Sequence, residues 1–290
     1  MANLWVRSAN ERFAFLMALP ALLLIGALVL YPLVSSLVMS FQMERNGEEA
    51  FVGLRNYSVA LMSSSFANAL GNTVVFTTLA VGIEVTLGLT LAMLLQAHGA
   101  RARRLFRSLI ILPLMISPTV AALEWGWLYN DRYGLFDYIT SKLGFGSPLW
   151  LSNPRLALFS IIAVDVWIAT PFAVLVFSAA LQSIPAEPLE AARVDGANRW
   201  QVFRYVQLPF LKPALLVVVL IRAMDAFRVF DIVYILTGGG PGVSTQTLSV
   251  YIFQTGFTFL NLERASALSF VMLCMIASVS LGLTVWLRRE

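Results

Sequence analysis

Long apolar segments, separated by shorter polar ones, run through almost the whole chain. A helix needs roughly 20 mostly apolar residues to cross the hydrocarbon core of a bilayer. The first candidate carries no charge and no convincing small-residue cleavage site, which favours a retained helix over a signal peptide. The pattern predicts an all-α membrane protein with six transmembrane helices, at residues 13–41, 70–96, 105–129, 156–182, 213–236 and 265–287.

Lysine and arginine residues are distributed unevenly between the polar segments. Twelve lie before the first span, between the second and third, between the fourth and fifth, and after the sixth, whereas six lie in the other loops. Cytoplasmic segments carry the excess of positive charge in membrane proteins. Both termini and the polar segment between the fourth and fifth spans are therefore predicted to face the cytoplasm.

Composition excludes a soluble protein. Hydrophobic residues make up 59% of the chain and charged residues 12%, against about 25% charged residues in soluble domains. The net charge of +4 is explained by orientation in the membrane rather than by a nucleic-acid partner. The one cysteine, Cys274, lies in the sixth span and the one histidine, His98, in a basic loop. The sequence therefore predicts no internal disulfide and no metal site.

The loops are too short for a separate enzymatic domain, and no internal repeat is visible. We divide the chain into an N-terminal transmembrane helix with its outer loop, residues 1–67, and a transmembrane core, residues 68–290. The core contains the cytoplasmic segment 185–209.

Local chemistry predicts that the segment 185–209 begins with a helix. Pro185 and Pro188 suit the first turn, where a missing N–H costs nothing. Glu187 and Glu190 place negative charge near the positive end of the helix dipole. Gly196 can adopt the left-handed conformation that ends a helix.

A second helix is predicted to follow, with Asn198 as its cap and Pro209 as its end. Its side chains allow an alternative role, an interfacial helix on the lipid headgroups with Trp200, Phe203 and Tyr205 as anchors.

The spacing of this segment resembles the signature loop of permease subunits from bacterial binding-protein-dependent ABC importers. In that family the loop forms coupling helices that dock onto ATPase subunits. The resemblance rests on, and assigns ATPase coupling to, Glu190, Ala191, Ala192, Asp195, Gly196, Ala197, Leu208 and Pro209.

A second stretch supports the resemblance. Residues 237–241 read Thr-Gly-Gly-Gly-Pro after the fifth span, similar to an outer loop in carbohydrate importers. The subunit that corresponds to the larger maltose-permease protein carries this loop, although this chain lacks that subunit's extra helices and large insertion. Asn72-Thr73 and Leu112-Pro113 match the family as well, and the likeness extends from about residue 68 to the C-terminus.

The resemblance implies a type I ABC importer permease fold and a role as transmembrane subunit for a sugar or sugar-like solute. It also implies a second homologous permease, two ATPase subunits that bind ATP and Mg, and an extracytoplasmic solute-binding protein, assembled in the lipid of a bacterial inner membrane. The chain has no phosphate-binding loop of the Gly-x-x-x-x-Gly-Lys-Ser/Thr type. It is therefore expected to be a transport subunit without a cofactor or ATPase site of its own.

Six charged residues lie inside apolar segments: Glu84, Asp165, Arg222, Asp225, Arg228 and Asp231. Such residues are costly in a bilayer, so they are expected to face protein or water. The last four are spaced three residues apart with alternating sign. They are interpreted either as an ion-pair ladder that braces the bundle or as part of a solute path.

The solute path would combine the fifth-span charges with aromatic faces for sugar rings. Its candidates are Asp225, Phe227, Arg228, Phe230, Asp231, Tyr234 and Trp125. Trp125 can instead belong to an interfacial aromatic belt.

Two other classes of function compete with the importer. An ion-coupled secondary carrier would use the fifth-span charges as a relay, but the repeats typical of such carriers are not visible. A membrane enzyme is disfavoured because no nucleophile–base pair is visible. The sequence leaves open whether the solute is a disaccharide, oligosaccharide, polyol, glycerol phosphate or acidic sugar, and which permease subunit holds it.

Overall fold

The computed structural model describes residues 13, 16–45, 48–97 and 100–289. His98 lies outside this part. The chain divides into two compact units, the first containing residues 1–62 and 252–271 and the second residues 63–251 and 272–290. Each is described by itself.

The first unit begins with the helix Leu16–Ser40, the first predicted span. Within this helix a π-helical turn (η1), Gly26–Leu30, leads into α2, Tyr31–Ser40. Two antiparallel strands, β1 (Gln42–Arg45) and β2 (Glu48–Phe51), follow it. The all-α prediction missed this hairpin, in which the backbone groups of the short loop after the first span satisfy one another.

A buried asparagine fastens the hairpin to the next helix, α3 (Arg55–Leu61). The Asn56 side chain donates to the carbonyl oxygens of Ser40, at 3.0 Å, and Gln42, at 2.7 Å. The unit also contains the π-helical turn η4, Gln254–Thr258, and the start of α14, Leu262–Arg289.

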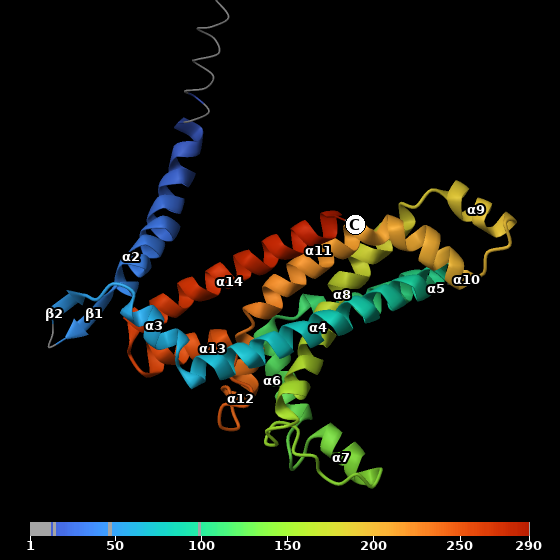
Figure 1. The fold of residues 1–290 in the computed structure, drawn as a ribbon. Helices are drawn as coiled ribbons and strands as arrows, with labels where there is room; N and C mark the ends of the chain where they lie inside the picture. The colour runs from blue at the N-terminus through green and yellow to red at the C-terminus, as the bar shows by residue number, and fades with distance from the viewer. Residues whose placement is uncertain (1–12, 14–15, 46–47, 98–99, 290) are drawn as a thin grey trace, which may run out of the picture. The chain divides into compact units, whose positions relative to one another are not determined.

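In the described part of the second unit, all regular elements are helical (Figure 1). Its elements are α4 (Ser64–Ala97), α5 (Ala100–Ile111), η2 (Leu112–Met115), α6 (Pro118–Leu128), α7 (Leu135–Lys142), α8 (Ala157–Gln182), α9 (Ala186–Val194), α10 (Arg199–Gln201), η3 (Val202–Gln207), α11 (Leu208–Phe227), α12 (Asp231–Thr237), α13 (Leu248–Phe253, shared with the first unit) and the end of α14.

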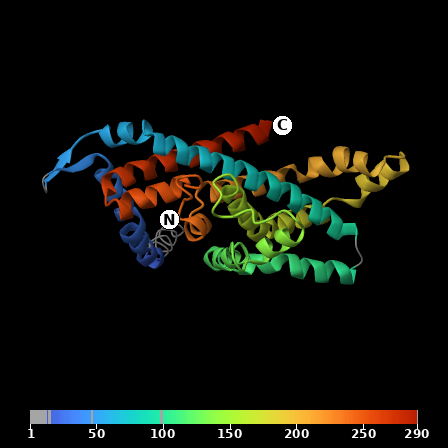
Figure 2. The ribbon, with the colours of Figure 1, turned by 90° about the horizontal axis from the view of Figure 1, so that it is seen from below.

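Three helices, α4, α8 and α11, pack against one another at the centre of this unit (Figure 2). α4 and α8 approach each other closely, because a Cβ added to Gly88 would lie 2.5 Å from the Cβ of Ala173. Small residues commonly let membrane helices approach this closely. Fully buried side chains such as Phe76, Ile161 and Phe177 fill the surrounding core.

The third predicted span, 105–129, is bent rather than straight. The helical segments Arg103–Met115 and Pro118–Leu128 meet at 99°. Prolines lack a backbone N–H and push the preceding residue into an extended conformation, and Ser117, just before Pro118, has ψ 147°. Its side chain caps α6 by accepting from the N–H of Val120 at 3.3 Å.

The fifth predicted span, 213–236, is wrong as a single helix. α11 ends at Phe227, three residues are not helical, and α12 begins at Asp231. The hydroxyl of Thr247 donates to the carbonyl oxygen of Val229 at 3.2 Å, which satisfies an acceptor that the break leaves without a helical partner.

Six spans are not confirmed. Among the described residues, four helices are long and apolar enough to cross a membrane, and the bent pair makes a fifth. α11 carries three charged residues, Lys212, Arg222 and Asp225, within 20 residues. It therefore carries more charged residues than any of the four helices that qualify as spans.

Candidate solute cavity and coupling loop

One buried guanidinium joins the three central helices. Arg222 of α11 donates from Nε to Glu84 Oε2 of α4 at 2.6 Å and from Nη2 to Glu84 Oε1 at 3.0 Å. Nη2 also donates to Asp165 Oδ2 of α8 at 3.0 Å. Glu84 is fully buried and Asp165 and Arg222 nearly so. Paired, bidentate geometry is the arrangement in which charges are tolerated away from water.

A second, more exposed pair lies at the end of α11. Arg228 Nη2 is 2.6 Å from Asp225 Oδ1, and Asp225 Oδ2 is 3.8 Å from Arg222 Nη1. The Arg228 side chain is 66% exposed. The predicted ladder therefore holds for three members only. Asp231 begins α12, is exposed, and has no ion pair or side-chain hydrogen bond within the described part of the chain.

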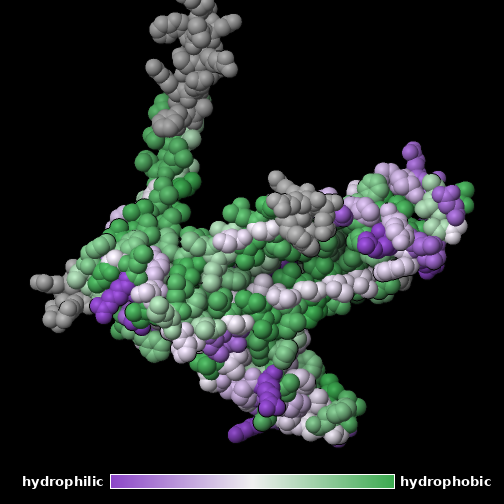
Figure 3. Space-filling view, in the orientation of Figure 1, coloured by the Kyte–Doolittle hydropathy of each residue, from purple (hydrophilic) through white to green (hydrophobic). Residues whose placement is uncertain are grey.

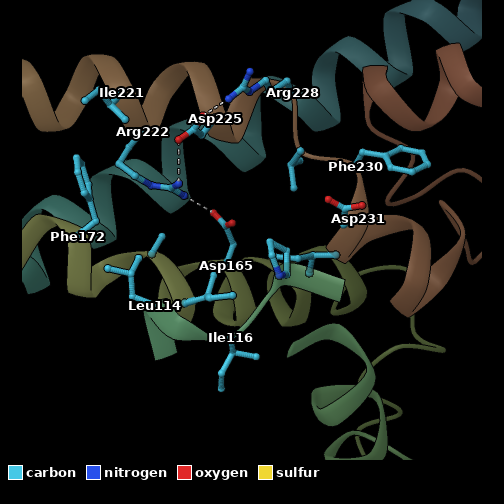
Figure 4. Close-up of a pocket in the computed structure, with 15 residues that line it drawn as sticks. Leu114, Ile116, Asp165, Phe172, Ile221, Arg222, Asp225, Arg228, Phe230 and Asp231 are labelled. Atoms are coloured by element: carbon cyan, nitrogen blue, oxygen red, sulfur yellow. Dashed lines mark hydrogen bonds and ion pairs between the residues drawn. The ribbon is translucent and has the colours of Figure 1, made fainter. Parts of the chain in front are cut away.

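All of these charged residues except Glu84 line a cavity of about 610 Å³. Figure 4 shows Asp165, Arg222, Asp225 and Asp231 around it, with Phe230 beside Asp231. Its apolar wall comes from α8, α11 and the bend before α6, through Leu114, Ile116, Ile168, Phe172 and Ile221. The volume is in the range of small-molecule sites.

Four of the seven predicted solute-path residues line this cavity: Asp225, Arg228, Phe230 and Asp231. The other three do not. Phe227 is buried, and Tyr234 stacks on Phe230 with ring centres 5.1 Å apart. Two further charged residues line the cavity: Asp165, which was not among the candidates, and Arg222, which was considered only as a member of the ladder. Their charge inside apolar segments was the signal that could have identified both.

Trp125 belongs to an aromatic cluster. Its ring centre lies 5.5 Å from that of Tyr129 and 5.6 Å from those of Phe136 and Trp167. It is packed between α6, α7 and α8 and does not line the cavity.

The glycine run after α12 is held by α4. Gly238 and Gly239 have φ of 61° and 96°, which glycine adopts without strain. Asn72 donates from its amide nitrogen to the carbonyl oxygens of Val243, at 3.0 Å, and Gln246, at 3.1 Å. The hydroxyl of Thr73 accepts from the N–H of Leu248 at 2.8 Å. The Asn72-Thr73 pair thus fastens the loop that follows the glycines.

The segment 185–209 begins as predicted. Pro185 precedes α9, which carries Glu187 in its first turn. Gly196 has φ of 78°, and the N–H groups of Gly196 and Ala197 donate to the carbonyls of Arg193, at 3.1 Å, and Ala192, at 2.9 Å. This pair of hydrogen bonds is typical of a helix that ends at a glycine in the left-handed conformation.

Asn198 caps the second helix as predicted. Its Oδ1 accepts from the N–H of Gln201 at 2.9 Å, and Gln201 Oε1 accepts from the N–H of Asn198 at 2.8 Å. This reciprocal pair is a capping box.

The prediction that Pro209 ends this helix is wrong. α10 continues through the π-helical turn η3 directly into α11, so the helical run reaches from Arg199 to Phe227. The N–H of Leu208 bonds back five residues to the carbonyl of Phe203. This wider turn shifts the carbonyls that a proline ring would otherwise contact.

The exposed surface of the segment 185–209 is polar, with a few exposed apolar side chains. Figure 3 shows hydrophilic side chains gathered over α9 and α10. Val194 is 86% exposed, Trp200 68% and Tyr205 75%. Large exposed apolar side chains amid charge are typical of a contact surface.

A family model described as "Binding-protein-dependent transport system inner membrane component" matches residues 84–289. The chain belongs to this family. The match contains the intramembrane charges, the cavity and the segment 185–209.

Relatives extend the likeness to nearly the whole chain. A probable ABC transporter permease protein, y4oQ, of Sinorhizobium fredii is 38% identical over 91% of this chain and 85% of its own length. The trehalose/maltose transport system permease protein MalF of Thermococcus litoralis is 38% identical over 84% of this chain and 83% of its own. The sulfoquinovosyl glycerol transport system permease protein SmoG of Agrobacterium fabrum is 33% identical over 95% and 90%.

A solved structure supports the fold. A chain of a bacterial ABC transporter involved in the import of the acidic polysaccharide alginate has a TM-score of 0.87, covering 99% of both chains at 22% identity. The chain is thus a helical membrane protein of the type I ABC importer permease fold.

Proposed function

We propose that this permease subunit belongs to an ATP-driven importer and translocates a sugar or sugar-like solute through the cavity. The names of its relatives support the solute class, because they include trehalose/maltose and sulfoquinovosyl glycerol systems. The proposed partners are a second permease, two ATPase subunits that bind ATP and Mg, and an extracytoplasmic binding protein. The family membership argues against an ion-coupled carrier.

One observation carries the mechanism: a single helical run connects the exposed loop to the cavity. It begins at the Asn198 cap and ends beside Arg222 and Asp225. A helix transmits displacement along its axis because its backbone hydrogen bonds are internal. An ATPase that moves α9 and α10 would therefore shift the charged wall of the cavity.

In this proposal the spacing of residues in the segment 185–209 has a physical role. Glu190 is exposed on α9, where a cationic groove of a partner can meet it. Ala191 and Ala192 leave a shallow surface next to it, and the turn at Gly196 fixes the angle between α9 and α10. The proposal puts the subunit in a bacterial inner membrane, with the segment 185–209 and both termini on the cytoplasmic side.

The test is coupling to the ATPase. Gly196→Val forces a β-branched residue to a φ of 78°, which costs on the order of 1–3 kcal/mol locally, and Glu190→Lys reverses a contact charge. Both variants are expected to insert normally but to lose most co-purifying ATPase and at least about tenfold of ATP-driven uptake.

Two substitutions elsewhere serve as controls. Gly282→Val lies on α14, where nothing approaches a new Cβ within 4 Å, and Glu124→Lys alters an exposed carboxylate of α6. Both are expected to retain ATPase. Wild-type ATPase binding and uptake in Gly196→Val and Glu190→Lys would refute the coupling role.

A further inference from the structure

We infer that the cavity accepts solutes without an acidic group and excludes sugar carboxylates, sulfonates and phosphates. The inference rests on the proposed function and narrows its solute class. The relatives leave this choice open, because a sulfoquinovosyl group carries a sulfonate whereas trehalose and maltose are neutral.

Both arginines at the cavity are already committed to carboxylates. Arg222 donates to Glu84 and Asp165, at 2.6 to 3.0 Å, and its remaining nitrogen lies 3.8 Å from Asp225. Arg228 is 2.6 Å from Asp225. An anionic solute that binds Arg222 would have to displace a buried carboxylate and leave it unpaired, which is costly away from water. One that binds the more exposed Arg228 would have to share its guanidinium with the negative charge of Asp225.

The ionisable residues at the cavity, counted together with Glu84 behind Arg222, carry a net negative charge. Four carboxylates, those of Glu84, Asp165, Asp225 and Asp231, stand against the two guanidiniums. When all are ionised the sum is −2, and a proton on one carboxyl of the buried trio leaves −1. The sign is therefore the same in both cases, and walls of low dielectric strengthen its effect on a charged solute.

Asp231 supplies the excess charge. Its carboxylate faces the cavity beside Phe230 (Figure 4), and it has no ion pair or side-chain hydrogen bond within the described residues. A carboxylate accepts hydrogen bonds but cannot donate them. It can receive the hydroxyl groups of a neutral sugar, while the Phe230 ring offers an apolar face to the ring carbons.

Charged thiol reagents measure this preference without knowledge of the natural solute. Cys274→Ala removes the one cysteine. Leu114→Cys and Ile221→Cys then place a thiol on two different elements of the cavity wall, at positions 43% and 37% exposed. Leu143→Cys, 67% exposed and outside the cavity, is the reference. Each full-length variant, in permeabilised membranes, reacts with a trimethylammonium or a sulfonate derivative of ethyl methanethiosulfonate.

The ratio of the cationic to the anionic rate constant is the readout, because a change in thiol acidity affects both reactions equally. At Leu114→Cys and Ile221→Cys this ratio is expected to exceed the Leu143→Cys ratio by about tenfold. Adding Asp231→Asn should lower it several-fold, whereas adding Glu124→Gln, on the same unit but not at the cavity, should not.

Equal ratios at the cavity and reference positions, or a faster sulfonate reaction, would overturn the inference, as would a ratio that Asp231→Asn leaves unchanged. The reaction needs neither ATP nor a partner. Failure of the proposed function appears instead as normal uptake by the coupling variants, so the two failures are distinguishable.

Discussion

At the scale of single residues, the two arginines of the cavity differ in burial rather than in chemistry. The side chain of Arg222 is 11% exposed and that of Arg228 66% exposed. A buried ion pair that loses one partner leaves an uncompensated charge, whereas an exposed pair contributes little.

Arg222→Met is therefore expected to destabilise the chain by about 3–5 kcal/mol, because Glu84 and Asp165 remain buried without a cation. Arg228→Met, the matched control, is expected to cost about 0–1 kcal/mol. The temperature at which half of the solubilised chain aggregates measures both.

Removing all three buried charges together tests whether unpaired charge is the cause of the lost stability. The triple variant Arg222→Met, Glu84→Gln and Asp165→Asn should recover part of the loss, since no ion is left unpaired. Equal aggregation temperatures for the two single variants would contradict the bracing role of Arg222.

The sequence predicted the roles of residues that interact with close neighbours in the chain, but not the partners of residues that interact with distant ones. Gly196 and Asn198 act within five residues of themselves, and the sequence predicted their roles as helix end and cap. Glu84 and Arg222 are 138 residues apart, and no periodicity pairs them. The sequence marked both as costly charges inside spans without showing that they meet.

At the scale of elements, the packing of α4 on α8 depends on the missing side chain of Gly88. A Cβ there would lie 2.5 Å from Ala173 Cβ and 3.3 Å from its backbone carbon. Neither helix can move without disturbing the buried Glu84–Arg222–Asp165 contacts, because Glu84 lies one turn from Gly88 on α4.

Gly88→Ala and Gly82→Ala, two substitutions on α4, are expected to act in opposite directions. Gly82 has nothing within 4 Å of a new Cβ, so alanine should stabilise the helix by about 0.5–1 kcal/mol. At Gly88 overpacking should cost about 1–3 kcal/mol. Aggregation temperatures of the two variants in the same detergent provide the comparison, and a shift of the same sign in both would contradict the close packing.

Apolar length predicted where helices lie but not where they break. The segment 213–236 is apolar enough to read as one helix, yet its break at 228–230 depends on Thr247, which bonds Val229 from 18 residues away. Pro209 shows the reverse error, because a local rule for prolines was overridden by the π-helical turn before it. In both cases a hydrogen bond to a backbone carbonyl, which the apolar pattern of the segment does not encode, accompanies the outcome.

At the scale of the whole molecule, the proposed orientation rests on the distribution of charge. Twelve of the lysines and arginines fall on the predicted cytoplasmic side and six on the other. The proposed coupling requires that the segment 185–209 lie on the side of the ATPases. A wrong orientation would thus invalidate the proposed contact.

Two valines provide a matched test of sidedness. Val194, at the end of α9, is 86% exposed, and Val243, after the glycine run, is 51% exposed. In a Cys274→Ala background, Val243→Cys is expected to react with a membrane-impermeant maleimide in intact spheroplasts. Val194→Cys should react only after the membrane is opened, because cytoplasmic loops carry the positive excess. Both should label fully in detergent, which establishes that each thiol is reachable. The reverse pattern would place the loop outside the cell, where no ATPase could bind it, and labelling of both in intact spheroplasts would show that the segments share the outer side.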